Sequence, residues 1–282
     1  MSLPAQLVPT AYGLISIFCW GTSDFLGGFA SRRSDPFVIT TLAHGSGLIL
    51  MLVMAVGTHA TLPTRSSTIW AMAAGALGGL GLALFYKALS TGHMGLNAPV
   101  AAVLGAAIPT IFSMFVQGIP RTLTIVGFVL AATGIWLISR QEGPSASKDG
   151  LPLSVLAGLG FAGFFICINR TGSASAVWSS AESRLASFAL VGLIALFAGR
   201  KKSLERVSTQ WALLAGCLDA TGTFFFIRAD QTGRLDSAVV LTSLYPAITV
   251  LLARVLLKEH FTRWKAVGIF AALLAVPLIA AQ

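Results

Sequence analysis

Apolar residues along the chain recur in blocks of roughly 20 residues, separated by short polar connections. Each block is long enough for an α-helix to cross a hydrocarbon layer of about 30 Å. The pattern therefore predicts an all-α integral membrane protein with ten transmembrane helices. The predicted spans are 9–30, 37–57, 69–90, 96–116, 122–139, 151–170, 176–198, 210–229, 236–257 and 264–280.

The two halves of the chain resemble each other. The stretch with the composition of a linker, RQEGPSASKDG at 140–150, divides the 282 residues almost at the middle. A shift of 141 residues, half of 282, aligns Trp70 with Trp211 and Gly75 with Gly216. Further coincidences at this offset extend over some 60 residues without a gap, which indicates an internal duplication.

The duplication predicts two five-helix units, residues 1–141 and 142–282. An odd number of spans per unit means that the second unit enters the membrane upside down relative to the first. Inverted repeats around a central cavity, with the substrate site near the midplane, are typical of secondary transporters. Channels are also built from repeats, so a passive channel or facilitator is the alternative.

Composition excludes a soluble protein. Of all residues, 55% are hydrophobic and 10% are charged, whereas soluble domains contain about 25% charged residues. The formal net charge of +9 would suggest nucleic acid in a soluble protein, but here most cations lie in the short connections, where they meet lipid headgroups. We therefore expect a multi-pass protein of the cell membrane that contacts lipids and binds no nucleic acid.

Residues 243–280, SLYPAITVLLARVLLKEHFTRWKAVGIFAALLAVPLIA, closely resemble the C-terminal signature of the EamA family in the drug/metabolite transporter superfamily. The shared features are a Tyr-Pro pair, an Arg, a basic-acidic loop and a glycine in the last helix. Cys19-Trp20-Gly21 is similar to the start of the family pattern, and residues 86–89 to the end of its third span. The resemblance implies ten helices around a central cavity, alternating access, and export or exchange of small metabolites, often driven by protons.

The chain departs from the family pattern in two ways. The first unit has Leu104-Gly105 where the family has Tyr-Pro, and Asp24 and Asp219 are acids that many relatives lack. Two indications of how the protein is oriented in the membrane also disagree. Most loop cations, for example Arg32, lie on the side opposite the termini, so the positive-inside rule places the termini outside, whereas the family is usually drawn the other way round.

Asp24 and Asp219 are the leading candidates for proton coupling or substrate binding. An acid inside a span costs about 2.5–3.5 kcal/mol on insertion scales, so it usually faces a cavity or a partner. Trp20 lies one helical turn before Asp24, and an aromatic ring beside a carboxylate can seat a cationic group. The same carboxylate could carry a proton. The structural alternative for both acids is hydrogen bonding to neighbouring hydroxyl groups.

Six further residues are candidates for the same site. His44 lies at a depth similar to that of Asp24 and could relay protons, although most helical histidines simply pack. The expected cavity residues, besides Trp20, are Asn97, Glu182, Arg184, Thr242 and Tyr245. Tyr245-Pro246 predicts a broken helix, and such helices line transporter cavities. Arg184 could bind an anionic group or pair structurally.

No motif in the chain favours an enzyme. HExxH, GxSxG and Walker A patterns are missing, and no His or Cys residues are spaced as metal ligands. We therefore expect no cofactor and no resident metal, and energy from an ion gradient or from the substrate's own gradient, with protons as the expected coupling ion. The sequence leaves the substrate, the direction of transport and the choice between a monomer and a homodimer open.

Overall fold

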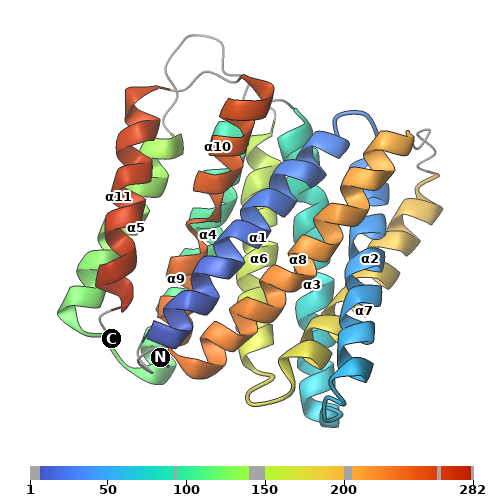
Figure 1. The fold of residues 1–282 in the computed structure, drawn as a ribbon, viewed down its shortest axis with the longest axis horizontal. Coiled ribbons are helices and arrows are strands. Elements are labelled where there is room, and N and C mark those ends of the chain that lie inside the picture. The colour runs from blue at the N-terminus through green and yellow to red at the C-terminus, as the bar shows by residue number, and fades with distance from the viewer. Residues whose placement is uncertain (1–6, 92–93, 140–149, 200–204, 259–261, 281–282) are drawn as a thin grey trace.

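A computed structural model describes residues 7–91, 94–139, 150–199, 205–258 and 262–280. Within these ranges the chain folds into helices that lie side by side in one bundle (Figure 1). The predicted linker, apart from Gly150, lies outside the described residues, as do the cations 200–202. The helices are α1 (Val8–Ala30), α2 (Pro36–Gly57), α3 (Arg65–Ser90), α4 (Met94–Gln117), α5 (Thr122–Ser139), α6 (Leu151–Asn169), α7 (Ala176–Phe197), α8 (Arg206–Thr232), α9 (Leu235–Thr242), α10 (Tyr245–Leu257) and α11 (Arg263–Ala280).

Local sequence explains where several helices begin. The Asp35 side chain accepts a hydrogen bond from the Phe37 amide at 2.9 Å, and Pro36 occupies the first turn of α2, where its missing N–H costs nothing. Thr64 caps α3 in the same way through the Ser67 amide at 3.3 Å. These caps place the polar connections at the ends of the bundle.

The predicted span 236–257 is broken into α9 and α10. Helix α9 ends at Thr242 and α10 begins at Tyr245, with Pro246 in its first turn. Because proline has no N–H to donate to the carbonyl one turn earlier, the helical ladder is interrupted here. The corresponding helix of the first half, α4, stays continuous through Pro99 and Pro109. The break is therefore a feature of the second half alone.

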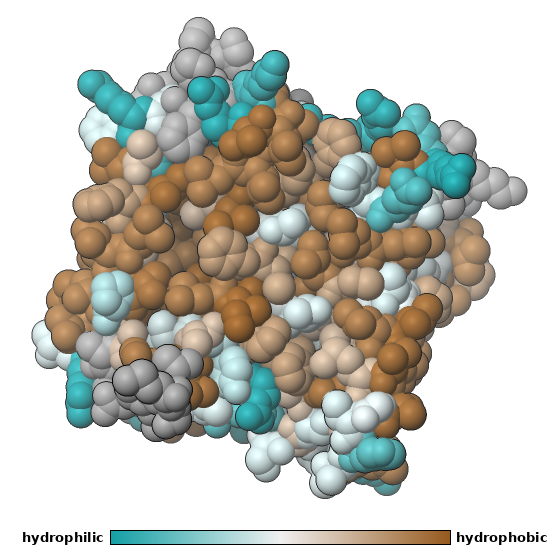
Figure 2. Space-filling view, in the orientation of Figure 1, coloured by the Kyte–Doolittle hydropathy of each residue, from teal (hydrophilic) through white to brown (hydrophobic). Residues whose placement is uncertain are grey.

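The face of the bundle seen in Figure 2 is largely hydrophobic. Figure 2 shows an apolar band between two edges that carry most of the hydrophilic residues. Eight segments in the described part of the chain are long and apolar enough to span a membrane, counting Leu235–Leu257 as one, and Thr122–Ile138 is a shorter apolar helix. Helix α1, with 23 residues, is not among the eight. The structure therefore supports a multi-pass membrane fold, while the count of ten spans stays a prediction.

Helix packing follows the internal duplication. If α1 corresponds to α6, α2 to α7, α3 to α8, α4 to the α9–α10 pair and α5 to α11, each main contact maps onto another. Thus α1 packs on α8 as α6 packs on α3, and α2 packs on α8 as α7 packs on α3. The pairs α2–α7 and α5–α11 map onto themselves and lie at opposite ends of the bundle (Figure 1). The helix contacts are therefore paired in the way that the duplication predicts.

Two glycines that correspond in the duplication permit the closest approaches. A Cβ at Gly75 of α3 would overlap the Ser183 carbonyl oxygen of α7, and a Cβ at Gly216 of α8 would overlap the Ala43 carbonyl oxygen of α2. Glycine is thus required at both positions by the neighbouring backbone, as in other helix interfaces built from small residues. These two contacts bring the polar side chains of α2, α7 and α8 together.

Candidate functional site

A cavity lies between the two units in the middle of the bundle, and water centres can occupy about 60 Å³ of it, which is room for several waters. Equivalent positions of the two units line it. At the offset of 141 residues Trp20 corresponds to Phe161, Asp24 to Phe165, Gly78 to Asp219, Leu82 to Thr223, and Ala102 to Ser243. His44, Ala101, Gly105, Phe164, Arg184 and Tyr245 complete the lining.

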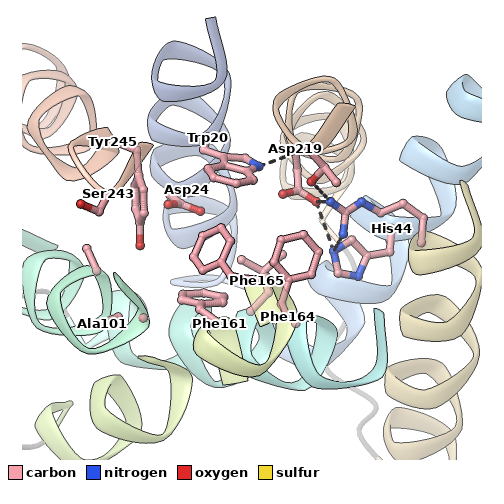
Figure 3. A pocket seen from close by; sticks show the side chains of 16 residues that line it. Trp20, Asp24, His44, Ala101, Phe161, Phe164, Phe165, Asp219, Ser243 and Tyr245 are labelled. Carbon is pink, nitrogen blue, oxygen red and sulfur yellow. Dashed lines mark hydrogen bonds and ion pairs between the residues drawn. The ribbon is translucent and has the colours of Figure 1, made fainter. Parts of the chain in front are cut away.

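Corresponding positions of the two units carry different types of side chain, so the cavity has two unlike walls. One wall, from the packed pair α1 and α8, presents Trp20, Asp24, Asp219 and Thr223. The opposite wall, from α3 and α6, presents only apolar side chains and glycine. Figure 3 shows the Phe161, Phe164 and Phe165 rings across the cavity from Asp24. We call these the polar wall and the aromatic wall.

Asp219 is held in a buried cluster of charges. One of its carboxylate oxygens, Oδ2, lies 3.2 Å from Nε2 of His44 and 3.2 Å from Nη2 of Arg184. Nη1 of Arg184 also lies 3.5 Å from His44 Nε2. The three side chains come from α8, α2 and α7, so the cluster joins both units (Figure 3). An ion pair this buried needs such partners, because each charge has lost its hydration.

Hydroxyl groups fix the geometry of this cluster. Arg184 Nη2 donates a hydrogen bond to Thr223, and the second ring nitrogen of His44, Nδ1, is hydrogen-bonded to Ser187. The indole N–H of Trp20 donates to the backbone carbonyl of Asp219 at 3.3 Å. Every ring nitrogen of His44 therefore has a partner, and Arg184 and Asp219 neutralise each other.

Asp24 is in the opposite situation. The residue is 6% exposed and lines the cavity, yet its carboxylate has no hydrogen-bond or ion-pair partner among the described residues. Tyr245 lies beside it in Figure 3, and the buried Tyr245 hydroxyl also lacks a partner within the described ranges. Two polar groups thus face the cavity with their hydrogen-bonding capacity unused. Unsatisfied buried polar groups of this kind cost free energy unless a ligand, water or proton meets them.

Aromatic rings enclose the space around Asp24. Trp20 stacks on Phe226 at a ring-centroid distance of 5.5 Å, and lies 5.8 Å from Phe165. Its edge contact with Tyr245, at 6.4 Å and 82°, brings the broken helix into the same cluster. The carboxylate therefore sits among π-faces, an arrangement that favours a bound cation over an anion.

Three predicted cavity residues lie away from this cavity. Glu182, on α7, accepts a hydrogen bond from Thr68 at 2.7 Å at the α3–α7 interface. Asn97 is buried and donates to the Ala88 carbonyl at 2.8 Å, tying the start of α4 to the end of α3. Thr242 bonds the Ala238 carbonyl of its own helix at 2.7 Å. Their contacts are those of structural residues, while Trp20, Asp24, His44, Arg184, Asp219 and Tyr245 share one cavity.

The sequence interpretation overlooked the aromatic wall and Ser243. A signal was present, because Phe161 and Phe165 are the partners of Trp20 and Asp24 at the offset of 141 residues. The same offset pairs Phe164 with Ser23, which was not a candidate, so the duplication points to two of the three rings. As for metals, no group of three or more His, Cys, Asp or Glu side chains in the described part of the chain could hold an ion.

Comparisons with known proteins agree with this architecture. Residues 9–140 and 148–281 each match the family described as the EamA-like transporter family. A segment of 70 residues is 36% identical to an uncharacterised membrane protein of Saccharomyces cerevisiae, covering 25% of this chain and 17% of that protein. Another, of 112 residues, is 30% identical to the uncharacterised transporter YyaM of Bacillus subtilis, covering 39% of this chain and 35% of YyaM.

Both relatives are thus matched over well under two thirds of their own length. A solved crystal structure shares the fold along almost the entire chain, with a TM-score of 0.74 over 96% of this chain and 95% of the other, at 19% identity. The resemblance noted from the Tyr-Pro signature is confirmed by the family match in both halves.

Proposed function

The chain belongs to the EamA-like transporter family, and from that premise we propose that it is a secondary active transporter that exports small metabolites in exchange for protons. The observation that carries the proposal is the buried carboxylate of Asp24, which lines a cavity between two related units and has no partner among the described residues. A carrier must bind its coupling ion and its substrate where both sides of the membrane can reach them in turn, and the interface of two repeats meets that need.

The charges in the cavity support exchange. The charges of Arg184 and Asp219 cancel. When Asp24 is ionised and His44 is neutral, the side chains that line the cavity therefore carry a net charge of about −1. A proton on Asp24 or a cationic group of the substrate supplies the missing positive charge. Among the described residues, Tyr245 lies beside Asp24 and Asp219 lines the same cavity, and neither supplies a positive charge (Figure 3).

His44 is less suited to carry that charge. A protonated His44 would place a second cation 3.5 Å from the Arg184 guanidinium in a site shielded from water. Competition between a proton and a substrate for Asp24 is therefore the simplest coupling scheme. Because one site binds either species, inward movement of protons can drive outward movement of the substrate.

The same proposal includes ten spans in two inverted units. Helix α1 has 23 residues, about 34 Å at 1.5 Å per residue, and packs along α8, so its length suffices to cross the bilayer despite Asp24. Helix α5 packs along α11, its counterpart in the second unit. With both included, each unit has five spans and the second unit is inverted.

Reconstituted vesicles test the function. Protein in sealed liposomes, with a pH-sensitive dye inside, is offered a panel of small amines, amino acids and carboxylates. We expect substrate-dependent proton movement and, under an imposed pH gradient, accumulation of the substrate above its external concentration. Asp24→Asn should abolish both, whereas Asp230→Asn, which alters an acid held by Asn169 outside the cavity, should preserve both.

The alternative, a passive channel, gives a different result in the same vesicles. A channel would let the substrate equilibrate but never accumulate, whatever pH gradient is imposed. If the Asp24→Asn variant still accumulates substrate as the wild type does, the protein is an active transporter but Asp24 is not its coupling residue.

A further inference from the structure

We infer that the cavity recognises an amphipathic organic cation, a protonated amine joined to an aromatic or bulky apolar body. This inference rests on the proposed function and names the substrate class of the same site. It follows from the two unlike walls of the cavity, since each wall favours a different part of one molecule.

The charged end of the ligand is specified by the polar wall. The buried Tyr245 hydroxyl has no hydrogen-bond partner in the described part of the chain, and no hydrogen bond or ion pair of the described residues reaches the Asp24 carboxylate, which lines the cavity. The carboxylate of Asp219, by contrast, lies 3.2 Å from both Arg184 Nη2 and His44 Nε2. A protonated amine can donate hydrogen bonds to Asp24 and to the Tyr245 oxygen. The Trp20 ring beside Asp24 adds a π-face toward the same charge.

An anionic ligand is disfavoured by the same contacts. Arg184 is the cation of the cavity lining that could receive a carboxylate, but its Nη2 already contacts Asp219 and Thr223 and its Nη1 lies near His44. Only its buried Nε has no hydrogen-bond partner among the described residues. An anion would also meet the uncompensated charge of Asp24 in a medium of low dielectric constant. Freeing Arg184 would leave Asp219 with His44 as its remaining partner, at a large cost in free energy.

The apolar end of the ligand is specified by the aromatic wall. Phe161, Phe164 and Phe165 present rings to the cavity. Gly78 of α3 and Gly105 of α4 give these rings room, because a Cβ at Gly78 would press on Phe164 and a Cβ at Gly105 on Phe161. This wall offers no polar group to a ligand. A ligand with a polar body would therefore lose its hydration without compensation, while an aromatic or branched apolar body would bury its surface favourably.

Four probes of one shape separate the possibilities. Phenethylamine is an aromatic cation, phenethyl alcohol its neutral counterpart, phenylacetate an anion, and phenylalanine a zwitterion with the same ring. Binding of each to the purified protein is measured by isothermal titration calorimetry and by the rise of the thermal unfolding midpoint. We expect phenethylamine to bind with a dissociation constant about tenfold or more below those of the other three.

Two variants locate the site. Asp24→Asn should weaken phenethylamine binding about tenfold or more and remove the preference for the cation over the alcohol. Phe161→Leu should weaken phenethylamine and phenethyl alcohol by a similar factor, because it changes the wall that both share. The unfolding midpoint of each variant without ligand shows whether the protein is still folded.

Outcomes for the class and for the function remain distinguishable. The cation class is overturned if phenylacetate, phenylalanine or phenethyl alcohol binds more tightly than phenethylamine. It is also overturned if phenethylamine does not bind the folded protein, or binds Asp24→Asn as tightly as the wild type. Phenethylamine binding without accumulation in vesicles supports the class and overturns proton-driven transport. Accumulation of a different class of solute supports transport and overturns the cation class.

Discussion

Asp24 and Asp219 differ in their neighbours rather than in their own chemistry. Both are acids inside long helices, and sequence alone gave them equal weight. In the folded chain Asp219 meets Arg184 and His44, each at 3.2 Å, while Asp24 meets none of the described cations. The first is therefore held as a fixed charge, and the second remains available to a proton or a ligand.

Breaking the buried pair should destabilise the protein strongly. Arg184→Met leaves Asp219 with only His44 beside it in a cluster where both original side chains are at most 11% exposed. We expect a loss of about 3 kcal/mol in the free energy of unfolding at neutral pH, the usual size for an orphaned buried charge. The measurement is unfolding of the purified variant in mixed detergent micelles at increasing dodecyl sulfate.

The loss should shrink as the pH falls. Protonation of His44 supplies a cation to Asp219, and in Arg184→Met the competing charge of Arg184 is gone. A matched control is Arg33→Met, since Arg33 pairs with Glu205 at 3.4 Å with both side chains largely exposed, and such pairs contribute at most about 1 kcal/mol. Equal losses for the two variants would contradict the assignment of Arg184 to a desolvated pair.

Glycines set the spacing between α2 and α8. Gly216 of α8 faces the Ala43 backbone, and His44 follows Ala43 directly, so this contact also positions His44 against Asp219. Gly216→Val should therefore separate the helices and cost about 1–3 kcal/mol through overpacking. We expect a lower thermal unfolding midpoint and weaker ligand binding together.

Gly57→Val provides the comparison for that substitution. Gly57 is the last residue of α2, and no atom lies within 4 Å of the position its Cβ would take. The same side chain added there should leave the unfolding midpoint and ligand binding nearly unchanged. If both variants unfold alike, the close approach of α2 and α8 is not what the glycine protects.

The positions of most helices were readable from hydropathy, but their ends and breaks were less so. The predicted span 37–57 corresponds to Pro36–Gly57, and 264–280 to Arg263–Ala280. Helix α3 starts at Arg65, four residues before the predicted 69, because Thr64 caps a polar first turn that an apolar block does not include. The Tyr245-Pro246 pair predicted the break between α9 and α10. A proline alone does not predict one, because α4 stays continuous through two prolines.

The candidate site was predictable only as far as one helix or one repeat reaches. Trp20 and Asp24 share a face because they are one turn apart, and they do line the same cavity. The meeting of His44, Arg184 and Asp219 depends on how α2, α7 and α8 pack, which spacing along the chain does not encode. Glu182 lies two residues before Arg184, and positions i and i+2 are on different faces of a helix. Its side chain is therefore in the α3–α7 interface, where it accepts a hydrogen bond from Thr68.

At the scale of the whole molecule, the two units are interleaved rather than placed side by side. The main helix contacts α1–α8, α3–α6, α2–α7, α3–α7, α2–α8, α4–α6 and α5–α11 all join one unit to the other. Contacts within a unit, such as α1–α2 or α7–α8, are fewer. The folded core is therefore built mainly from contacts between the two halves of the chain.

This interleaving predicts the behaviour of a divided chain. Residues 1–139 and 150–282, expressed separately, should each insert into membranes but lack a stable fold, because the faces buried in the intact bundle would have no partner. Expressed together, they should assemble into a complex that co-purifies through a tag on one fragment and restores phenethylamine binding. The assembly needs no covalent link, since the contacts that define the cavity lie between fragments. A cooperative thermal transition of either fragment alone would show that this fragment carries its own core. Failure of the two fragments to associate would show that the contacts between them are not sufficient for assembly.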